Sequence, residues 1–190
     1  MPGSVPTVAT DDDNSGFRAL EEDIVYDGWI MKVAVGRFEA PDGSVFERDV
    51  VHHPGAVAVV PLVDDDIILV RQYRSALDAN LLEIPAGLRD VGGEPPAETA
   101  RRELIEEIGM EPGTLTPLAA IHNSAGYSDE QIHIFIGTDL IEVAREMTDS
   151  PEEHAMEILR IPLTEAHNMI ATGELTDAKT IIGVLAALRL

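Results

Sequence analysis

The stretch from Gly87 to Met110, GLRDVGGEPPAETARRELIEEIGM, decides how the rest of the chain is interpreted. Pro95 and Pro96 suit the start of a helix, because the first turn needs no backbone donor. Gly109 suits the left-handed residue that commonly follows a helix. Between them, apolar residues recur at spacings of three and four. This pattern predicts a helix from about Pro95 to Ile108 with one buried face.

Three glutamates, Glu103, Glu106 and Glu107, gather at one edge of this helix. At about 100° per residue they lie roughly a right angle from the apolar face, so we expect them neither buried nor fully exposed. Their mutual repulsion and the helix dipole both disfavour them at the C-terminal end. A hard divalent cation would remove this penalty, because Mg²⁺ prefers oxygen ligands. On the helix alone, a solvated acidic face is the alternative interpretation.

The wider pattern resembles the Nudix box: Gly, a spacer, Glu, a second spacer, then Arg-Glu-apolar-any-Glu-Glu-any-Gly-apolar. The chain supplies Glu94, seven further residues, and then a matching run from Arg102 to Met110. The spacer between Gly87 and Glu94 is six residues, one longer than the usual form. The resemblance implies an α/β fold, the Nudix-type α/β/α sandwich with a mixed sheet. It also implies a hydrolase that cleaves the pyrophosphate bond of a nucleoside diphosphate derivative.

The resemblance assigns a role to each matching residue. Arg102 would orient the glutamates, and Glu94 would pair with it or approach a metal through water. The implied cofactor is Mg²⁺, with Mn²⁺ as the alternative, and it would activate the water that attacks phosphorus. Glu106 would also contribute to catalysis. The implied metal ligands are the carbonyl of Ala86 and the side chains of Glu103, Glu107 and Glu106.

Segments outside the box resemble the ADP-ribose pyrophosphatase branch of this family: Gln72–Arg74, Glu83–Gly87 and Ser128–Glu130. That branch implies cleavage of ADP-ribose to AMP and ribose 5-phosphate. It also implies a homodimer whose N-terminal strands reach into the partner, with Arg48 contributing across the interface. However, members that cleave ADP-ribose carry a proline where this chain has Ala125. Other sugar nucleotides, dinucleoside polyphosphates and a non-catalytic nucleotide-sugar sensor therefore remain alternatives.

Three residues are candidates for substrate contacts. Arg48 and Arg74 could bind phosphate, since a guanidinium grips two oxygens at once, although a salt bridge with a nearby acid is the alternative for each. Trp29, the only tryptophan, could stack on the base, although a lone aromatic residue in a strand is more often part of the core.

The catalytic base is expected on an acidic loop after the box, between Glu142 and Glu153. In the branch that the chain resembles, this base is a glutamate. Glu153 is the first candidate and Glu152 the second, while His154 could also serve because its ordinary pKa is near neutrality. A solvated loop acid is the alternative for either glutamate.

The charge of the chain limits its partners. The net charge is −22, from 35 acidic and 13 basic residues. Because such a surface repels phosphate polymers and anionic lipid, we expect a small-molecule substrate and neither nucleic acid nor a membrane as partner. The absence of cysteine excludes disulfides and fits a reducing compartment, so we expect a cytoplasmic protein. No apolar run is long enough for a membrane helix.

The expected organisation is a disordered tail over residues 1–20 followed by one domain over residues 21–190. Thr164 is expected to cap a helix that ends at Thr172, and Asp177 to cap a last helix from Ala178 to Leu190. Asp64–Asp66 is expected to join two strands in a hairpin. The expected strands are Trp29–Val35, Val45–His52, Gly55–Leu62, Ile67–Tyr73, Leu81–Ile84, Leu115–His122, Gln131–Thr138 and Met156–Ile161.

Overall fold

The structure is a computed structural model that describes residues 15–146 and 151–189, apart from the side chain of Glu153. By its internal contacts the chain separates into two compact units. The first unit comprises residues 1–55 and 122–131, and the second comprises residues 56–121 and 132–190. The division arises because the three N-terminal strands form a sheet of their own.

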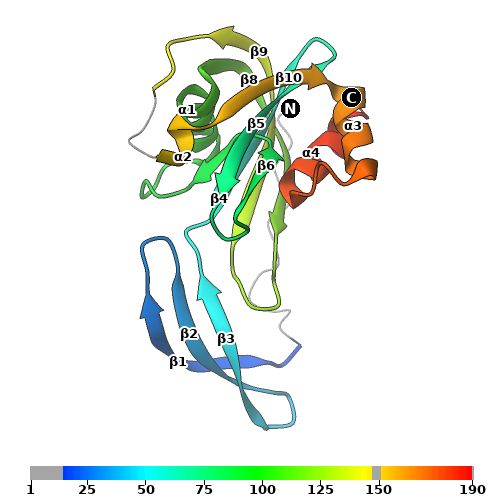
Figure 1. The fold of residues 1–190 in the computed structure, drawn as a ribbon. Helices are drawn as coiled ribbons and strands as arrows, with labels where there is room; N and C mark the ends of the chain where they lie inside the picture. The colour runs from blue at the N-terminus through cyan, green and yellow to red at the C-terminus, as the bar shows by residue number, and fades with distance from the viewer. Residues whose placement is uncertain (1–14, 147–150, 190) are drawn as a thin grey trace. The chain divides into compact units, whose positions relative to one another are not determined.

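The first unit is built on a three-stranded antiparallel sheet, β1 (Arg18–Asp27), β2 (Lys32–Glu39) and β3 (Val45–His52) (Figure 1). The predicted tail extended to residue 20, whereas β1 begins at Arg18. Arg18 pairs with Glu39 of β2 in both the strand register and an ion pair, which explains why the strand starts there. Residues 1–14 lie outside the described part of the chain.

Trp29 does not lie in a strand, contrary to the sequence prediction. It belongs to the turn between β1 and β2, which the Gly28 amide closes by donating to the Met31 carbonyl at 3.0 Å. The indole is 99% exposed, so Trp29 is no part of a core.

The second unit contains a mixed sheet with strand order β10–β5–β4–β9–β8, extended by β6 on β5 and β7 on β4. Strand β4 pairs in parallel with β9 and antiparallel with β5 and β7, so the sheet is mixed. The hairpin predicted at Asp64–Asp66 is present between β4 and β5. The strands are β4 (Ala56–Val63), β5 (Asp66–Arg74), β6 (Ala79–Glu83), β7 (Ala86–Leu88), β8 (Met110–His122), β9 (Gln131–Glu142) and β10 (Glu157–Pro162).

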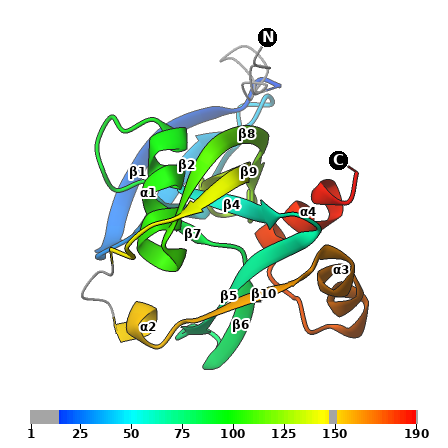
Figure 2. The same ribbon diagram turned by 90° about the horizontal axis from the view of Figure 1, so that it is seen from above.

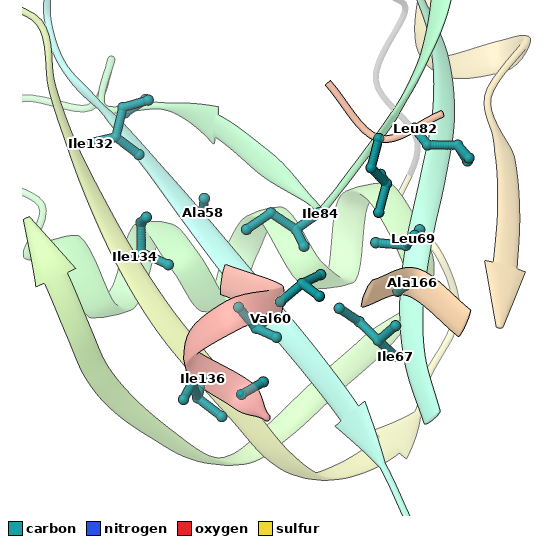
Figure 3. Packing of buried hydrophobic residues seen from close by; sticks show 14 residues of the cluster. Ala58, Val60, Ile67, Leu69, Leu82, Ile84, Ile132, Ile134, Ile136 and Ala166 are labelled. Atoms are coloured by element: carbon teal, nitrogen blue, oxygen red, sulfur yellow. The ribbon is translucent and has the colours of Figure 1, made fainter. Parts of the chain in front are cut away.

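Helices cover both faces of this sheet, which confirms the predicted α/β/α sandwich. Helix α1 (Pro96–Ile108) lies on one face, and α3 (Leu163–Thr172) and α4 (Ala178–Ala187) lie on the other (Figure 2). Strand β4 is apolar along almost its whole length because both of its faces are covered. Ala58 and Val60 point into the cluster shared with α3 and α4, where Ile67, Ile84 and Ile136 also pack (Figure 3).

The helix ends agree with the sequence in most places. Pro95 is the N-cap of α1, and Gly109 follows the helix with a φ of 66°. Asp177 caps α4 by accepting from the Thr180 amide at 3.0 Å. The cap predicted at Thr164 is wrong, because α3 begins one residue earlier with Pro162 as its N-cap.

One short helix, α2 (Pro151–His154), was not predicted. It lies at the end of the segment expected to be a loop, and the preceding residues 147–150 lie outside the described part. Within the described residues, no helix combines the length and the apolar character required to cross a membrane.

Candidate active site

The glutamates of α1 lie deeper than the sequence predicted. Glu103 is only 8% exposed and Glu107 only 5%, while Glu106 is partly exposed. The expectation that all three lie at the edge of the core is therefore wrong for two of them. The helix geometry was predicted correctly, and the difference comes from the loop and strand that pack over this edge.

Gly87 allows Glu103 to approach the backbone of β7. A Cβ placed on Gly87 would lie 1.9 Å from the carboxyl carbon of Glu103, so any larger residue would displace the carboxylate. The neighbouring Ala86 amide donates to the Glu107 carboxylate at 3.0 Å. The Ala86–Gly87 backbone therefore contacts two glutamates from adjacent turns of α1.

Burial of these two carboxylates disfavours their charged forms. Desolvation raises the pKa of Glu107 to about 8, although the hydrogen bond from Ala86 acts in the opposite direction. Desolvation likewise raises the pKa of Glu103 to about 7, opposed by the charge of Arg102 and supported by that of Glu106. A cation bound beside these two acids would stabilise their charged forms.

Arg102 is the cation that the chain itself supplies. Its Nη1 lies 2.9 Å from an oxygen of Glu103 and 2.9 Å from one of Glu106. Its Nη2 lies 3.5 Å from Asp90 and 3.6 Å from Glu94, too far for hydrogen bonds. Both Nη2 and one oxygen of Glu94 are buried without a hydrogen-bond partner.

The donor set suits a hard divalent cation, which prefers carboxylate and carbonyl oxygens. Within the described residues, no three acidic or histidine side chains already surround one point as metal ligands. The reason lies in their present hydrogen bonds. Glu106 is turned to Arg102, and one oxygen of Glu107 is turned to the Ala86 amide. Small side-chain rotations would be needed to bring the carboxylates to a shared cation.

The C-terminal end of α1 is held from outside the helix. The last turn contains no basic residue. Instead Arg145, which follows β9, donates from Nε to the Glu106 carbonyl at 2.9 Å. The Val143 amide donates to the Gly109 carbonyl at 2.9 Å. A cation from another segment therefore offsets the negative end of the helix dipole beside the glutamates.

Arg74 forms an ion pair with Glu83, which is buried, whereas the alternative predicted for Arg74 was a surface salt bridge. Its Nε and Nη2 donate to the two carboxylate oxygens, each at 2.6 Å. Glu83 is 1% exposed, and Lys179 of α4 donates to the same carboxylate. Burial favours the neutral form of Glu83, but the two cations outweigh it and lower the pKa.

The Glu83 network also ties α4 to the strand that leads into the site. The Ile84 amide donates to the Thr180 hydroxyl at 2.9 Å, and that hydroxyl donates to Asp177 at 2.6 Å. Sequence reasoning missed Glu83 and Lys179. A lysine in the otherwise apolar run of α4 was the available signal, because a buried lysine needs an acidic partner.

The remaining substrate candidates belong to the first unit. The guanidinium carbon of Arg48 lies 4.7 Å from the centroid of the Phe46 ring, and Arg48 donates to the Glu47 carbonyl at 2.7 Å. It lines a cavity of about 430 Å³ together with Phe46, Ala125 and Tyr127. Trp29 does not line this cavity. The aromatic lining was not predicted from the sequence.

The candidate bases lie in or near α2. The Glu152 side chain is exposed. The backbone of Glu153 belongs to the helix, but its side chain lies outside what the structure describes. His154 ends the helix and is also exposed.

Comparisons with known proteins agree with this geometry. A model of the NUDIX domain matches residues 52–182. The chain is 34% identical over 168 residues to the ADP-ribose pyrophosphatase of Bacillus subtilis (strain 168), covering 88% of this chain and 90% of that protein. It is 37% identical over 171 residues to the ADP-ribose pyrophosphatase of Mycobacterium tuberculosis (strain ATCC 25618 / H37Rv), covering 90% and 82%.

A solved structure supports the same assignment. The crystal structure of an ADP compounds hydrolase matches with a TM-score of 0.79 and 25% identity, covering 91% of this chain and 92% of that chain. The domain match includes the whole of α1 and the Ala86–Gly87 segment that packs on it. The chain therefore belongs to the Nudix family and is a hydrolase similar to the ADP-ribose pyrophosphatases.

Proposed function

We propose that the protein hydrolyses the pyrophosphate bond of a nucleoside diphosphate derivative with the help of a divalent cation. ADP-ribose, cleaved to AMP and ribose 5-phosphate, is the first candidate substrate. One observation carries the proposal: Glu103 and Glu107 are buried side by side against the Ala86–Gly87 backbone, with pKa values raised to about 7 and 8. A cation would stabilise their charged forms and neutralise an incoming diphosphate.

The cofactor we propose is Mg²⁺, with Mn²⁺ as the alternative. Arg102 and Glu94 would orient the acidic cluster. Once bound, the metal would lower the pKa of a coordinated water and offset the charge that develops on phosphorus. The residues we propose as ligands are the side chains of Glu103, Glu107 and Glu106 and the carbonyl of Ala86.

The proton acceptor is proposed in α2, with Glu153 as the first candidate and Glu152 as the second. A carboxylate there would take the proton of the attacking water, so no covalent protein intermediate is required. Glu106 is the alternative on α1, where its carboxylate lies among the proposed ligands and is bonded to Arg102.

The substrate contacts we propose are Arg48 for phosphate and Trp29 for the base. The placement of Arg48 over Phe46 in a cavity supports its candidacy, and the full exposure of Trp29 leaves its ring free to stack. Arg74 is held by Glu83, so its contribution to phosphate binding would have to be shared with that ion pair. Ala125 leaves sugar nucleotides and dinucleoside polyphosphates as alternative substrates.

The test is a substrate panel. The protein is incubated with Mg²⁺ or Mn²⁺ and with ADP-ribose, other sugar nucleotides or dinucleoside polyphosphates, and the products are identified by chromatography. We expect metal-dependent formation of AMP and ribose 5-phosphate from ADP-ribose. Binding of these compounds without any cleavage would support the sensor alternative, and failure to bind or cleave any of them would overturn the proposal.

We also propose a cytoplasmic homodimer. All ten residues of β1 are exposed, and its large apolar side chains Leu20, Ile24 and Tyr26 would suit contact with a second copy of the chain. Light scattering after size-exclusion chromatography should give twice the chain mass of 20.5 kDa. A monomer at micromolar concentration would contradict this part of the proposal.

A further inference from the structure

The proposed substrate is a polyanion, and several basic side chains of the second unit are already paired with acids. Arg102 already lies among four carboxylates, and Arg74 and Lys179 share Glu83. Arg89, which directly follows β7, is not paired with an acid in this way. It makes no ion pair with the acidic side chains that the structure describes, which leave out Glu153 and residues 147–150, and its Nε is buried without a hydrogen-bond partner.

The register of β7 indicates on which face of the sheet the next residue, Arg89, lies. Gly87 pairs with Val57 of β4, and Val57 pairs with His133 of β9. Paired residues present their side chains to the same face, and Val57 packs in the cluster beneath α1. The Cβ direction of Gly87 meets the Glu103 carboxylate on this face. Side chains alternate along an extended chain, so continuing the β7 register by one residue past Leu88 places Arg89 on the same face as Gly87.

His133 provides a second polar group beside Arg89. Burial lowers the pKa of His133, and the charge of Arg89 lowers it further. The register agrees with this influence, because Gly87 of β7 and His133 of β9 both pair with Val57 of β4. At neutral pH the imidazole is uncharged, so it can offer one donor and one acceptor without repelling the guanidinium.

We propose that Arg89 and His133 form a phosphate-binding site for the diphosphate of the substrate. A guanidinium can donate two parallel hydrogen bonds to phosphoryl oxygens, which would satisfy the buried Nε as well as the unpaired charge. The neighbouring imidazole adds a neutral hydrogen bond. The inference rests on the proposed function, because the diphosphate is the anion that this site would receive.

The test compares Arg89→Gln with Arg160→Gln, which removes the same charge from an exposed ion pair on β10. With ADP-ribose and Mg²⁺, we expect Arg89→Gln to raise KM about tenfold or more, as loss of a charged hydrogen bond would. Arg160→Gln should stay within about twofold of the wild type. Arg89→Lys keeps the charge but loses the planar fork, so its KM should lie between those of Arg89→Gln and the wild type.

A second measurement separates binding from a structural role. Added KCl should raise KM steeply for the wild type and weakly for Arg89→Gln, because the variant lacks the charge that salt screens. His133→Ala should raise KM by a smaller factor, with an unchanged melting midpoint. If Arg89→Gln does not fold, Arg89→Lys must show the raised KM at a wild-type melting midpoint.

The outcomes also distinguish this inference from the proposed function. If the wild type cleaves ADP-ribose but Arg89→Gln and Arg160→Gln have equal KM values and equal salt dependence, the phosphate site is overturned and the hydrolase stands. If the wild type cleaves nothing, calorimetric titration with ADP-ribose decides. Weaker binding by Arg89→Gln alone would then support the site while the proposed hydrolysis fails.

Discussion

Two buried carboxylates in the second unit have opposite electrostatic environments. Glu83 and Glu107 are both almost completely shielded from solvent, and burial opposes the charge of each. Arg74 and Lys179 bind Glu83 directly and lower its pKa. Glu107 receives one hydrogen bond from the Ala86 amide and only the more distant influence of those cations, and its pKa rises to about 8.

The difference separates a carboxylate that supports the fold from one that is prepared for a ligand. Glu83 has its cations built in, so it ties β5, β6 and α4 together at any pH near neutrality. Glu107 has no ion pair of its own and gains most from a cation that arrives from solution.

The largest expected effect is on stability and comes from Glu83→Ala. This change leaves Lys179 and Arg74 without their shared partner, and removing one member of a buried pair typically costs about 3–5 kcal/mol. Urea unfolding measures the loss. Glu157→Ala, which breaks the exposed pair with Arg71, is the control and should cost less than about 1 kcal/mol. Equal losses in the two variants would mean that the Glu83 network is no stronger than a surface pair.

Glu107→Gln should affect activity instead. We expect turnover of ADP-ribose to fall at least ~100-fold, because the amide cannot replace a carboxylate ligand in metal-assisted phosphoryl chemistry. The free energy of unfolding should stay the same or increase, since the change removes an acid whose charge is disfavoured by burial. Glu165→Gln in α3, on the opposite face of the sheet, is the control for loss of one acid. Near-normal turnover in Glu107→Gln would remove this residue from the proposed ligand set.

Gly87→Ala should show a smaller effect on the same site. The added methyl group would push the Glu103 carboxylate away from β7, and a displacement of that kind can lower turnover roughly 10- to 100-fold. The fold should survive, because the displaced atoms end a flexible side chain. Gly92→Ala is a matched control, since nothing lies within 4 Å of its Cβ position. If both variants keep full activity, the close approach of Glu103 to Gly87 has no role in the reaction.

The sequence was sufficient to predict α1, its ends and the identity of its acids. Periodicity fixes which residues share a helix face, and Pro95 and Gly109 have strong local preferences. The depth of Glu103 and Glu107 could not be predicted in the same way. It depends on β7 packing across the helix, a contact between segments separated in the chain.

The wrong strand prediction for Trp29 has a similar cause. Trp29 follows a glycine and precedes a strongly β-forming run, so local preference favoured a strand. Instead, the backbone hydrogen bond from Gly28 to Met31 closes a turn, and this turn places Trp29 in solvent. The ion-pair partner of a charged residue is also difficult to predict from the sequence. Many acids could have paired with Arg74, and Glu83 is identified as its partner only by the pairing of β5 with β6.

The smallest expected effect is the pH dependence of stability in the absence of metal. The folded-state pKa values of Glu103 and Glu107 are raised above their ordinary value of 4.5, to about 7 and 8. At pH values between the ordinary pKa and the raised pKa, the folded state binds more protons than the unfolded state. The free energy of unfolding therefore falls as pH rises from about 5 to about 8. His52 in the first unit has a raised pKa from Asp129 and Glu22 and shifts stability in the same direction. Because His52 contributes equally in both proteins, the difference in stability between the wild type and Glu107→Gln gives the contribution of Glu107.

We expect the wild type to lose on the order of 1–2 kcal/mol more than Glu107→Gln over this pH range. Millimolar Mg²⁺ should reverse most of that difference at pH 8 and change little at pH 5, where protons already neutralise the acids. Urea unfolding midpoints of both proteins at pH 5 and pH 8, with and without Mg²⁺, measure this difference and its reversal. A wild type that gains stability between pH 5 and 8 relative to the variant would show that Glu107 is already compensated, as Glu83 is, and would remove the contrast between the two carboxylates.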